Sequence, residues 1–284
     1  MADEGSDTRR DPWLGTRVHV VASRQSRPNL PAHDCPFCPG GMEAPEPYEV
    51  RWFENRWPPM QGNRCEVLLY SPEHDASLAS LGPDGVLRVV NLWAERTSAL
   101  RSRDDVEYVL VFENRGATVG ATIGHPHGQV YAFDHVPERP ARLLESGWTP
   151  DPSPGERLVI DDSGFTVYAQ EAAVHPVALT VAPKERVADL PSMDPAARAA
   201  LARTLADVLG RLDRLHGEPL PYMMWLNQAP RSSHTGTAWF NIEIVSPMRA
   251  PGVQRFVAAA EIATWEYFNP VRPEDLAVRL RGLA

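Results

Sequence analysis

Four residues of the types that bind zinc lie far apart along this chain, and they constrain its fold. Cys35 and Cys38 form a Cys-x-x-Cys pair, His74 follows a Ser-Pro-Glu turn, and His125 begins a His-Pro-His segment. Two thiolates and two imidazoles are a typical tetrahedral zinc set, and one shared ion would force these segments together. Four protein ligands leave no open position for a reactive water. We therefore expect a structural zinc ion.

Other interpretations of these residues are open. His33 lies beside the cysteine pair, but we favour His74 and His125 as the imidazole ligands. Alternatively, the two cysteines are buried thiols and His74 is a surface residue. The third cysteine, Cys65, is expected to pack in the core as a small hydrophobic residue.

The second histidine of the His-Pro-His segment, His127, is the expected nucleophile. Pro126 fixes the backbone between the two imidazoles, so one can bind metal while the other attacks. A neutral imidazole can attack phosphorus and form a phosphoramidate when its other nitrogen donates to a carbonyl. Gln129 can donate its amide hydrogens to a phosphoryl oxygen. A lone His-x-His is often only a metal or core feature, but this context favours nucleotidyl transfer.

The composition favours an ordinary globular protein. The chain has 284 residues, of which 43% are apolar, and a net charge of -9 that argues against a broad nucleic-acid surface. The sequence has no run of eighteen apolar residues, and its start is acidic, unlike a signal peptide. Three cysteines make no disulfide framework. We expect a cytoplasmic protein without nucleic-acid or membrane partners.

The pattern of apolar residues predicts an α+β fold. Short β-branched or aromatic runs indicate strands at residues 109–112, 129–133, 165–168, 177–181 and 241–245. An amphipathic helix is expected around residues 86–100, and a second one begins at Pro195 after the N-cap Asp194 and ends by Gly217. Each half thus offers strands and one long helix. We expect duplicated units, residues 1–150 and 151–284, that share an antiparallel sheet with helices packed on it.

The stretch from Phe112 to Gln129 reads Phe-Glu-Asn-Arg-Gly, and later Gly-His-Pro-His-Gly-Gln. It resembles the active-site strand and loop of the galactose-1-phosphate uridylyltransferase family, in the histidine-triad superfamily. The resemblance covers most of the chain and implies histidine-triad-like units, the four zinc ligands above and a uridylylated His127. It implies that Gln129 distinguishes the transferases from relatives with a third histidine. The implied reaction converts UDP-glucose and galactose 1-phosphate into glucose 1-phosphate and UDP-galactose, in a homodimer.

The resemblance also implies substrate contacts, with the catalytic zinc-binding half at the N-terminus and sugar binding and dimerisation in the C-terminal half. The implied nucleotide, phosphate and sugar ligands are Arg24, Arg27, Asn55, Asn114, Gly120, Thr122 and Glu261.

The chain departs from the family pattern in two places. Asn227, Trp239 and Asn241 stand where many members carry histidines for a second metal, so that site is expected to be absent. Thr264, Trp265 and Glu266 replace small residues near the hexose, which leaves a different sugar 1-phosphate open.

Three other functions remain alternatives. A nucleotide phosphorylase or adenylyltransferase of the same superfamily would use phosphate as acceptor or adenylate as donor. A zinc-ribbon module that binds nucleic acid is disfavoured by the charge. A zinc hydrolase is disfavoured by the closed ligand shell.

Overall fold

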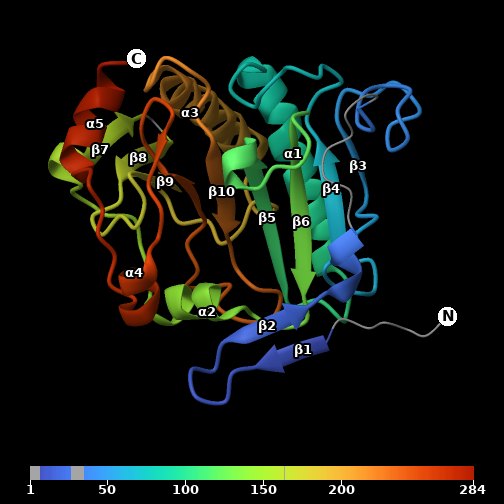
Figure 1. The fold of residues 1–284 in the computed structure, drawn as a ribbon. Helices are drawn as coiled ribbons and strands as arrows, with labels where there is room; N and C mark the ends of the chain where they lie inside the picture. The colour runs from blue at the N-terminus through green and yellow to red at the C-terminus, as the bar shows by residue number, and fades with distance from the viewer. Residues whose placement is uncertain (1–6, 27–34, 163) are drawn as a thin grey trace.

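The computed structural model describes residues 7–26, 35–162 and 164–284. A nine-stranded antiparallel sheet with the order β3-β4-β6-β5-β10-β11-β9-β8-β7 forms its centre (Figure 1). The strands are β3 (Arg51–Glu54), β4 (Cys65–Leu69), β5 (Tyr108–Arg115), β6 (His127–Phe133), β7 (Leu158–Asp161), β8 (Phe165–Ala169), β9 (Val177–Pro183), β10 (Tyr222–Asn227) and β11 (Asn241–Ser246).

The two halves of the chain repeat one topology. In the first half β3 and β4 precede helix α1 (Gly82–Arg101), and β5 and β6 follow it. In the second half β8 and β9 precede helix α3 (Pro195–Arg214), and β10 and β11 follow it. Both sets of four strands have the same neighbour order, and β5 pairs with β10 to join them. The predicted duplicated α+β fold with a shared antiparallel sheet is confirmed.

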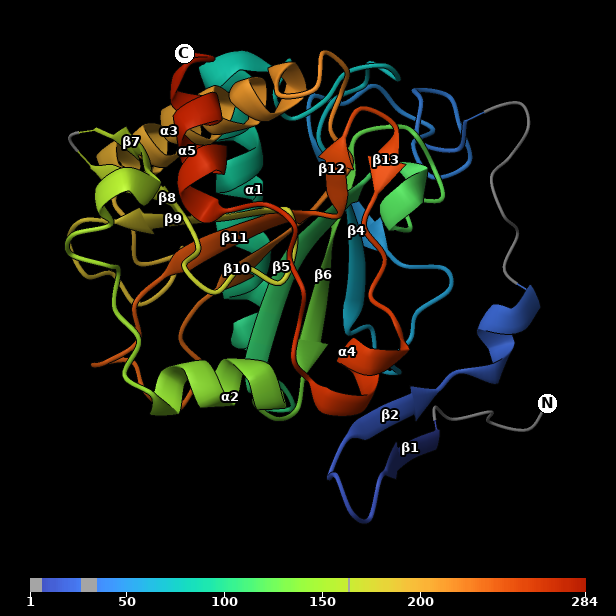
Figure 2. The ribbon, with the colours of Figure 1, turned by 60° about the vertical axis from the view of Figure 1, so that its left-hand side comes forward.

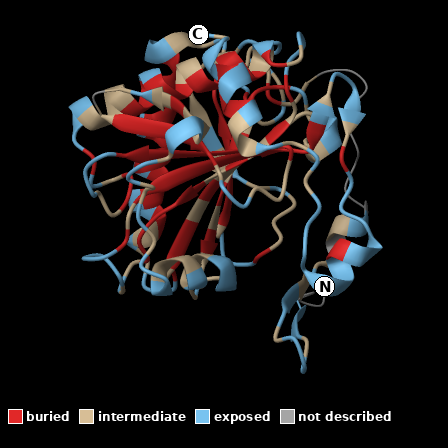
Figure 3. Ribbon diagram, turned by 90° about the vertical axis from the view of Figure 1, so that its left-hand side faces the viewer, coloured by how far each residue is buried: buried red, intermediate tan, exposed pale blue. Residues whose placement is uncertain are grey.

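The core lies between the sheet and its two long helices. Helices α1 and α3 pack against each other, and the strands of the sheet are largely coloured as buried in Figure 3. Trp93 of α1 and Leu205 of α3 are fully buried in one apolar cluster with Val130 of β6. Asp194 caps α3, because its carboxylate accepts a hydrogen bond from the Ala197 amide at 2.7 Å. The five predicted strands and both helices are present.

The burial of β6 alternates with the pleat of the strand. Gly128, Val130 and Ala132 are buried, while His127 and Gln129 are half-exposed. Successive side chains of a strand point to opposite faces, so the second set lies on the face away from α1. The sheet therefore presents the predicted site residues on its face away from the two long helices.

Smaller elements surround the sheet. Helix α5 (Pro273–Arg281) packs on β7 and β8 near the top of Figures 1 and 2, whereas α2 (Glu138–Glu145) and α4 (Ala259–Thr264) lie near the bottom. The hairpin of β1 (Asp7–Arg10) and β2 (Arg17–Val20) projects from the body (Figure 2). A short 3-10 helix, η1 (Ala22–Ser26), follows it, η2 (Ala117–Val119) follows β5, and η3 (Gly155–Arg157) precedes β7. Strands β12 (Met248–Ala250) and β13 (Val253–Gln254) form a separate hairpin.

Among the described residues, no helix is long and apolar enough to cross a bilayer.

Candidate functional site

The four predicted metal ligands meet at one point. One ligand atom from each of Cys35, Cys38, His74 and His125 lies within 4.8 Å of every other. Cys38 Sγ lies 3.6 Å from His74 Nδ1 and 3.7 Å from His125 Nδ1. Zinc–sulfur and zinc–nitrogen bonds of ordinary length, set at tetrahedral angles, separate sulfur from nitrogen by roughly 3.6 Å. The residues therefore fit a tetrahedral metal ion.

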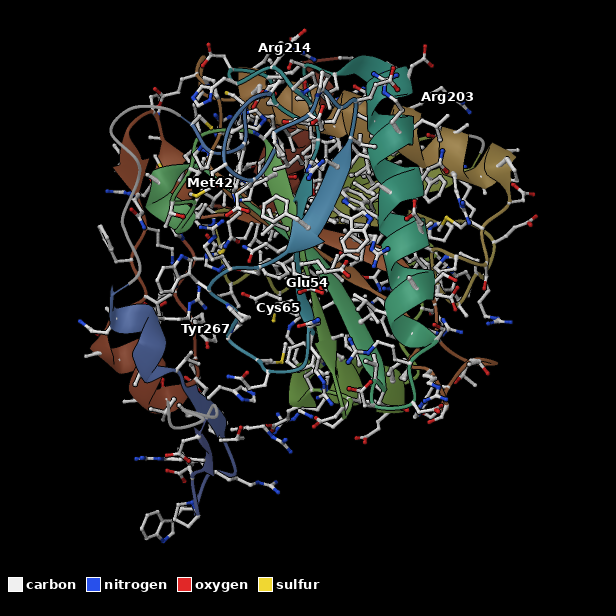
Figure 4. All side chains as sticks on the ribbon, turned by 90° about the vertical axis from the view of Figure 1, so that its right-hand side faces the viewer. Met42, Glu54, Cys65, Arg203, Arg214 and Tyr267 are labelled. Atoms are coloured by element: carbon white, nitrogen blue, oxygen red, sulfur yellow. The ribbon has the colours of Figure 1, made fainter. Side chains whose placement is uncertain are left out.

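A tight turn brings the two cysteines together. The Cys38 amide donates to the Cys35 carbonyl at 3.3 Å, and the Gly41 amide donates to the Cys38 carbonyl at 2.8 Å. A Cβ atom at Gly41 would lie 2.6 Å from the carbonyl oxygen of Cys35 and 2.7 Å from that of Pro36. This turn therefore requires glycine at position 41, which the spacing of the cysteines alone does not reveal. Cys65 lies outside the cluster and is buried in β4 as predicted (Figure 4).

His125 is held in the form that binds metal through Nδ1. The imidazole is buried, and its Nε2 lies 2.7 Å from the carbonyl oxygen of Ser71. A carbonyl only accepts, so Nε2 carries the hydrogen and Nδ1 presents its lone pair to the cluster. Desolvation lowers the pKa of His125, which favours the neutral form that ligates metals.

His127 has the opposite arrangement of nitrogens. Its Nδ1 lies 2.8 Å from the carbonyl oxygen of His125, so Nδ1 donates and Nε2 carries the lone pair that a nucleophile needs. The ring of Phe37 packs against the His127 ring with centroids 5.2 Å apart. The backbone of one histidine therefore sets the tautomer of the other, and His125 presents Nδ1 where His127 presents Nε2.

Gln129 follows His127 on the same face of β6. Its Oε1 accepts hydrogen bonds from Asn55 Nδ2 and from Tyr131 Oη, each at 3.4 Å. These bonds point the carbonyl oxygen of the Gln129 amide toward Asn55 and Tyr131. The NH₂ group at the other end of the amide therefore points away from these two residues. The arrangement is compatible with donation to a phosphoryl oxygen beside His127.

His127 lines three cavities of about 890, 660 and 240 Å³. The largest of the three is bounded by Phe53, by Trp57 and by the cysteine loop (residues 35–43). Met42, which is labelled in Figure 4, belongs to this loop. The smallest includes Arg24 of η1. The predicted ligands that line at least one of these cavities are Arg24, Asn55, Asn114, Gly120, Thr122 and Gln129.

Glu261 is not among the residues that line these three cavities. It lies on α4, is 4% exposed, and accepts hydrogen bonds from the amides of Ala258 at 2.8 Å and Phe268 at 2.9 Å. Arg255 also pairs with its carboxylate. Arg27 falls outside the described residues.

Asn227, Trp239 and Asn241, which the resemblance places where a second metal site is expected to be absent, bond to one another and to neighbouring groups. Asn227 Nδ2 donates to Asn241 Oδ1 at 2.7 Å and to Glu243 Oε1 at 2.8 Å, and Arg139 pairs with the same carboxylate. The Trp239 indole donates to the Pro183 carbonyl at 3.1 Å. The guanidinium of Arg139 therefore supplies the positive charge that faces the Glu243 carboxylate.

The sequence reasoning missed several residues that shape the site. Phe37 packs on His127, and Tyr70 occupies the space where a side chain at Gly128 would lie. Tyr48 binds the ring of His125 with its hydroxyl. These contacts join segments far apart in the chain, and no local pattern marks them.

The fold is that of a uridylyltransferase. A solved structure described as a uridylyltransferase superposes with a TM-score of 0.89 at 26% identity, covering 97% of this chain and 98% of that one. The family described as galactose-1-phosphate uridyl transferase, N-terminal domain, matches residues 54–137.

Two curated relatives extend the match along the chain. The galactose-1-phosphate uridylyltransferase of Streptomyces lividans is 37% identical over 79% of this chain and 70% of its own length. That of Thermotoga maritima is 31% identical over 97% of this chain and 98% of its own length. The chain therefore belongs to the galactose-1-phosphate uridylyltransferase family.

Proposed function

We propose that this protein exchanges uridylate between UDP-glucose and galactose 1-phosphate, giving glucose 1-phosphate and UDP-galactose. Membership of the family supports the reaction class. The observation that carries the proposal is the 2.8 Å contact between His127 Nδ1 and the His125 carbonyl oxygen. This contact leaves the lone pair of His127 on Nε2, beside cavities large enough for a nucleotide sugar.

The proposed chemistry is a double displacement. His127 Nε2 attacks the α-phosphorus of UDP-glucose, a P–N bond forms, and the P–O bond to glucose 1-phosphate breaks. The phosphate oxygen of galactose 1-phosphate then attacks the same phosphorus, and the P–N bond breaks. Arg24 and Asn114, which share a cavity with His127, are proposed to hold the phosphates, and Gln129 donates to a nonbridging oxygen. Asn55, Gly120 and Thr122 are the other proposed ligands.

We propose zinc as the ion of the four-ligand cluster. Cys35, Cys38, His74 and His125 would hold it, and its contribution is structural because the four ligands complete a tetrahedral shell. The carbonyl that accepts the hydrogen bond from His127 Nδ1–H belongs to His125, one of the four proposed metal ligands. A metal ion that fixes the position of His125 would therefore also fix the carbonyl to which His127 Nδ1–H donates, and with it the orientation of the His127 ring.

A homodimer in the cytoplasm is the proposed state of the protein. The segment around α4 exposes several large apolar side chains, among them Phe256, Ile262, Trp265 and Phe268, each at least 57% exposed. Exposed apolar patches of this kind are typical of protein interfaces. Glu261 does not line the three cavities beside His127 of its own chain, and we propose that its contact with a sugar arises in a site built from two subunits.

Intact-protein mass spectrometry tests the reaction. Mixing the protein with UDP-glucose and no acceptor is expected to add one uridylyl group that maps to His127, and adding galactose 1-phosphate is expected to remove it. His127→Asn is expected to form no adduct. An adduct on another residue, or exchange catalysed by His127→Asn, would exclude the mechanism.

Two further results of this experiment distinguish the alternative functions. An adduct that persists after galactose 1-phosphate is added would indicate a different sugar 1-phosphate as acceptor. An adduct formed with ADP-glucose, and not with UDP-glucose, would instead identify an adenylyltransferase or phosphorylase of the same superfamily.

A further inference from the structure

Tyr48 lies at the junction of three segments that build the metal cluster. It belongs to the stretch between the cysteine loop and β3. Its Oη lies 2.6 Å from the carbonyl oxygen of Phe37, 2.8 Å from that of Ser71 and 2.9 Å from His125 Nε2. The hydroxyl of Tyr48 therefore contacts the cysteine turn, the segment that follows β4 and the ring of a proposed metal ligand.

The hydrogens at this junction can be assigned from the donors and acceptors. A phenol has one hydrogen to donate, and both carbonyls can only accept. The shortest contact assigns the Tyr48 hydrogen to the Phe37 carbonyl. His125 Nε2–H then donates to the Ser71 carbonyl at 2.7 Å, with Tyr48 Oη as a second acceptor. The 2.7 Å contact between His125 Nε2 and the Ser71 carbonyl needs a hydrogen that only Nε2 can carry, so His125 Nδ1 faces the metal cluster without one.

The contact with Phe37 has a second consequence. Phe37 lies between the two cysteines, and its ring packs edgewise on His125 at 6.1 Å and on His127 at 5.2 Å between centroids. By holding the carbonyl of Phe37, Tyr48 fixes the turn that presents both thiolates and the ring that packs on His127. The same hydroxyl thus acts on two ligand segments at once.

We propose that Tyr48 is a positioning residue that supports the His125 tautomer set by the Ser71 carbonyl and fixes the shape of the cysteine turn, and so determines how tightly the cluster holds its metal. It acts through the ligands and touches neither substrate nor metal. The inference rests on the proposed metal site and not on the transfer reaction. Outer partners of metal-binding histidines typically change metal affinity by about 10- to 100-fold when removed.

The test compares Tyr48→Phe with a matched control. Tyr168→Phe also removes one phenol hydroxyl, which accepts a hydrogen bond from the Asp151 amide at 3.2 Å in the second half of the chain. Zinc affinity of the full-length proteins is measured by competition for Zn²⁺ with a chromophoric chelator. Unfolding midpoints in urea are measured on the same samples.

We expect Tyr48→Phe to bind zinc at least about tenfold more weakly than the wild type, and Tyr168→Phe to bind it equally well. Equal zinc affinity of Tyr48→Phe and the wild type would overturn the role of Tyr48 and leave the metal site intact. A wild-type protein that binds no zinc would overturn both. Neither result depends on uridylyl transfer, so a failure of the proposed reaction is detected separately.

Long-range ¹H–¹⁵N spectra of the zinc-loaded histidines give a second readout. In the wild type we expect His125 as the Nε2–H tautomer, with a Nε2 proton protected from exchange. In Tyr48→Phe we expect faster exchange of that proton, because one of its two acceptors is lost. If the exchange rate of this proton and the zinc affinity are both the same in Tyr48→Phe and the wild type, Tyr48 contributes only packing and the proposed role is overturned.

Discussion

At the scale of single residues, Glu113 is the most unusual group near the site. It precedes Asn114 on β5, but its side chain points into the core, where it is 3% exposed. Tyr222 Oη donates to its Oε1 at 3.0 Å, while Oε2 has no hydrogen-bond partner. Burial raises the pKa of this carboxyl to about 7. Glu113 is therefore protonated below neutral pH in the folded protein.

This pKa predicts how stability depends on pH. The ordinary pKa of a glutamate is 4.5, so between pH 4.5 and about 7 the folded state binds more protons than the unfolded state. The stability due to this group is complete below pH 4.5 and falls as pH rises through about 7. The full difference in unfolding free energy is of the order of 3 kcal/mol.

Glu113→Gln is expected to lose this part of the pH dependence. Urea unfolding at pH 5 and pH 8 should show a smaller loss of stability for the variant than for the wild type. Glu145→Gln, which removes an exposed carboxylate on α2, should follow the wild type. If Glu113→Gln and the wild type lose the same stability between these pH values, the shifted pKa is wrong.

At the scale of elements, strand β6 depends on close packing at Gly128. The hydroxyl of Tyr70 occupies the position of a Cβ at Gly128, and its Cζ would lie 2.8 Å from that atom. Trp93 Nε1 of α1 donates to the Tyr70 hydroxyl at 3.2 Å, and the Tyr70 amide donates to the Pro126 carbonyl at 3.2 Å. The end of β4, the start of β6 and helix α1 therefore meet where position 128 has no side chain.

Gly128→Ala is expected to destabilise the protein by about 1–3 kcal/mol, because the methyl group overlaps a buried ring that cannot move away. Adding Tyr70→Phe removes the hydroxyl from the contact and should restore part of the loss in urea unfolding. The recovery stays partial because the ring carbon is still close. A double variant no more stable than Gly128→Ala would show that the clash is not the cause.

At the scale of the whole molecule, the two halves are joined by main-chain and side-chain contacts. Strands β5 and β10 pair from Phe112 opposite Trp225 to Arg115 opposite Tyr222. Arg115 also forms an ion pair with Asp213 of α3, and α1 packs along α3. A cut between residues 150 and 151 would therefore divide a chain whose two halves share one sheet and one core.

A fragment of residues 1–150 is therefore expected not to fold alone. It would expose the edge of β5 and the face of α1 that packs on α3. We expect poor dispersion in its ¹H–¹⁵N spectrum and no cooperative thermal transition, with recovery when residues 151–284 are added. A dispersed spectrum and a cooperative transition for the fragment alone would instead define it as an independent domain.

The sequence by itself determined the chemistry and the local structure of this protein. The Cys-x-x-Cys pair, the His-Pro-His segment and the cap of α3 are recognisable because residue type and short spacing decide which side chains could bind a metal and where a helix starts. The β-branched and aromatic runs at residues 109–112 and 129–133 predict strands that the structure contains as β5 and β6.

Only the tertiary structure decided which distant residues act together. The hydroxyl of Tyr48 meets His125 across 77 positions, and the pairing of β5 with β10 depends on the register of strands that are far apart in sequence. It also decided that Glu261 is absent from the cavities beside His127 and that Asn227 and Asn241 bond to each other. Such contacts depend on how whole elements pack, and the energy of packing is shared among many side chains rather than encoded in a short motif.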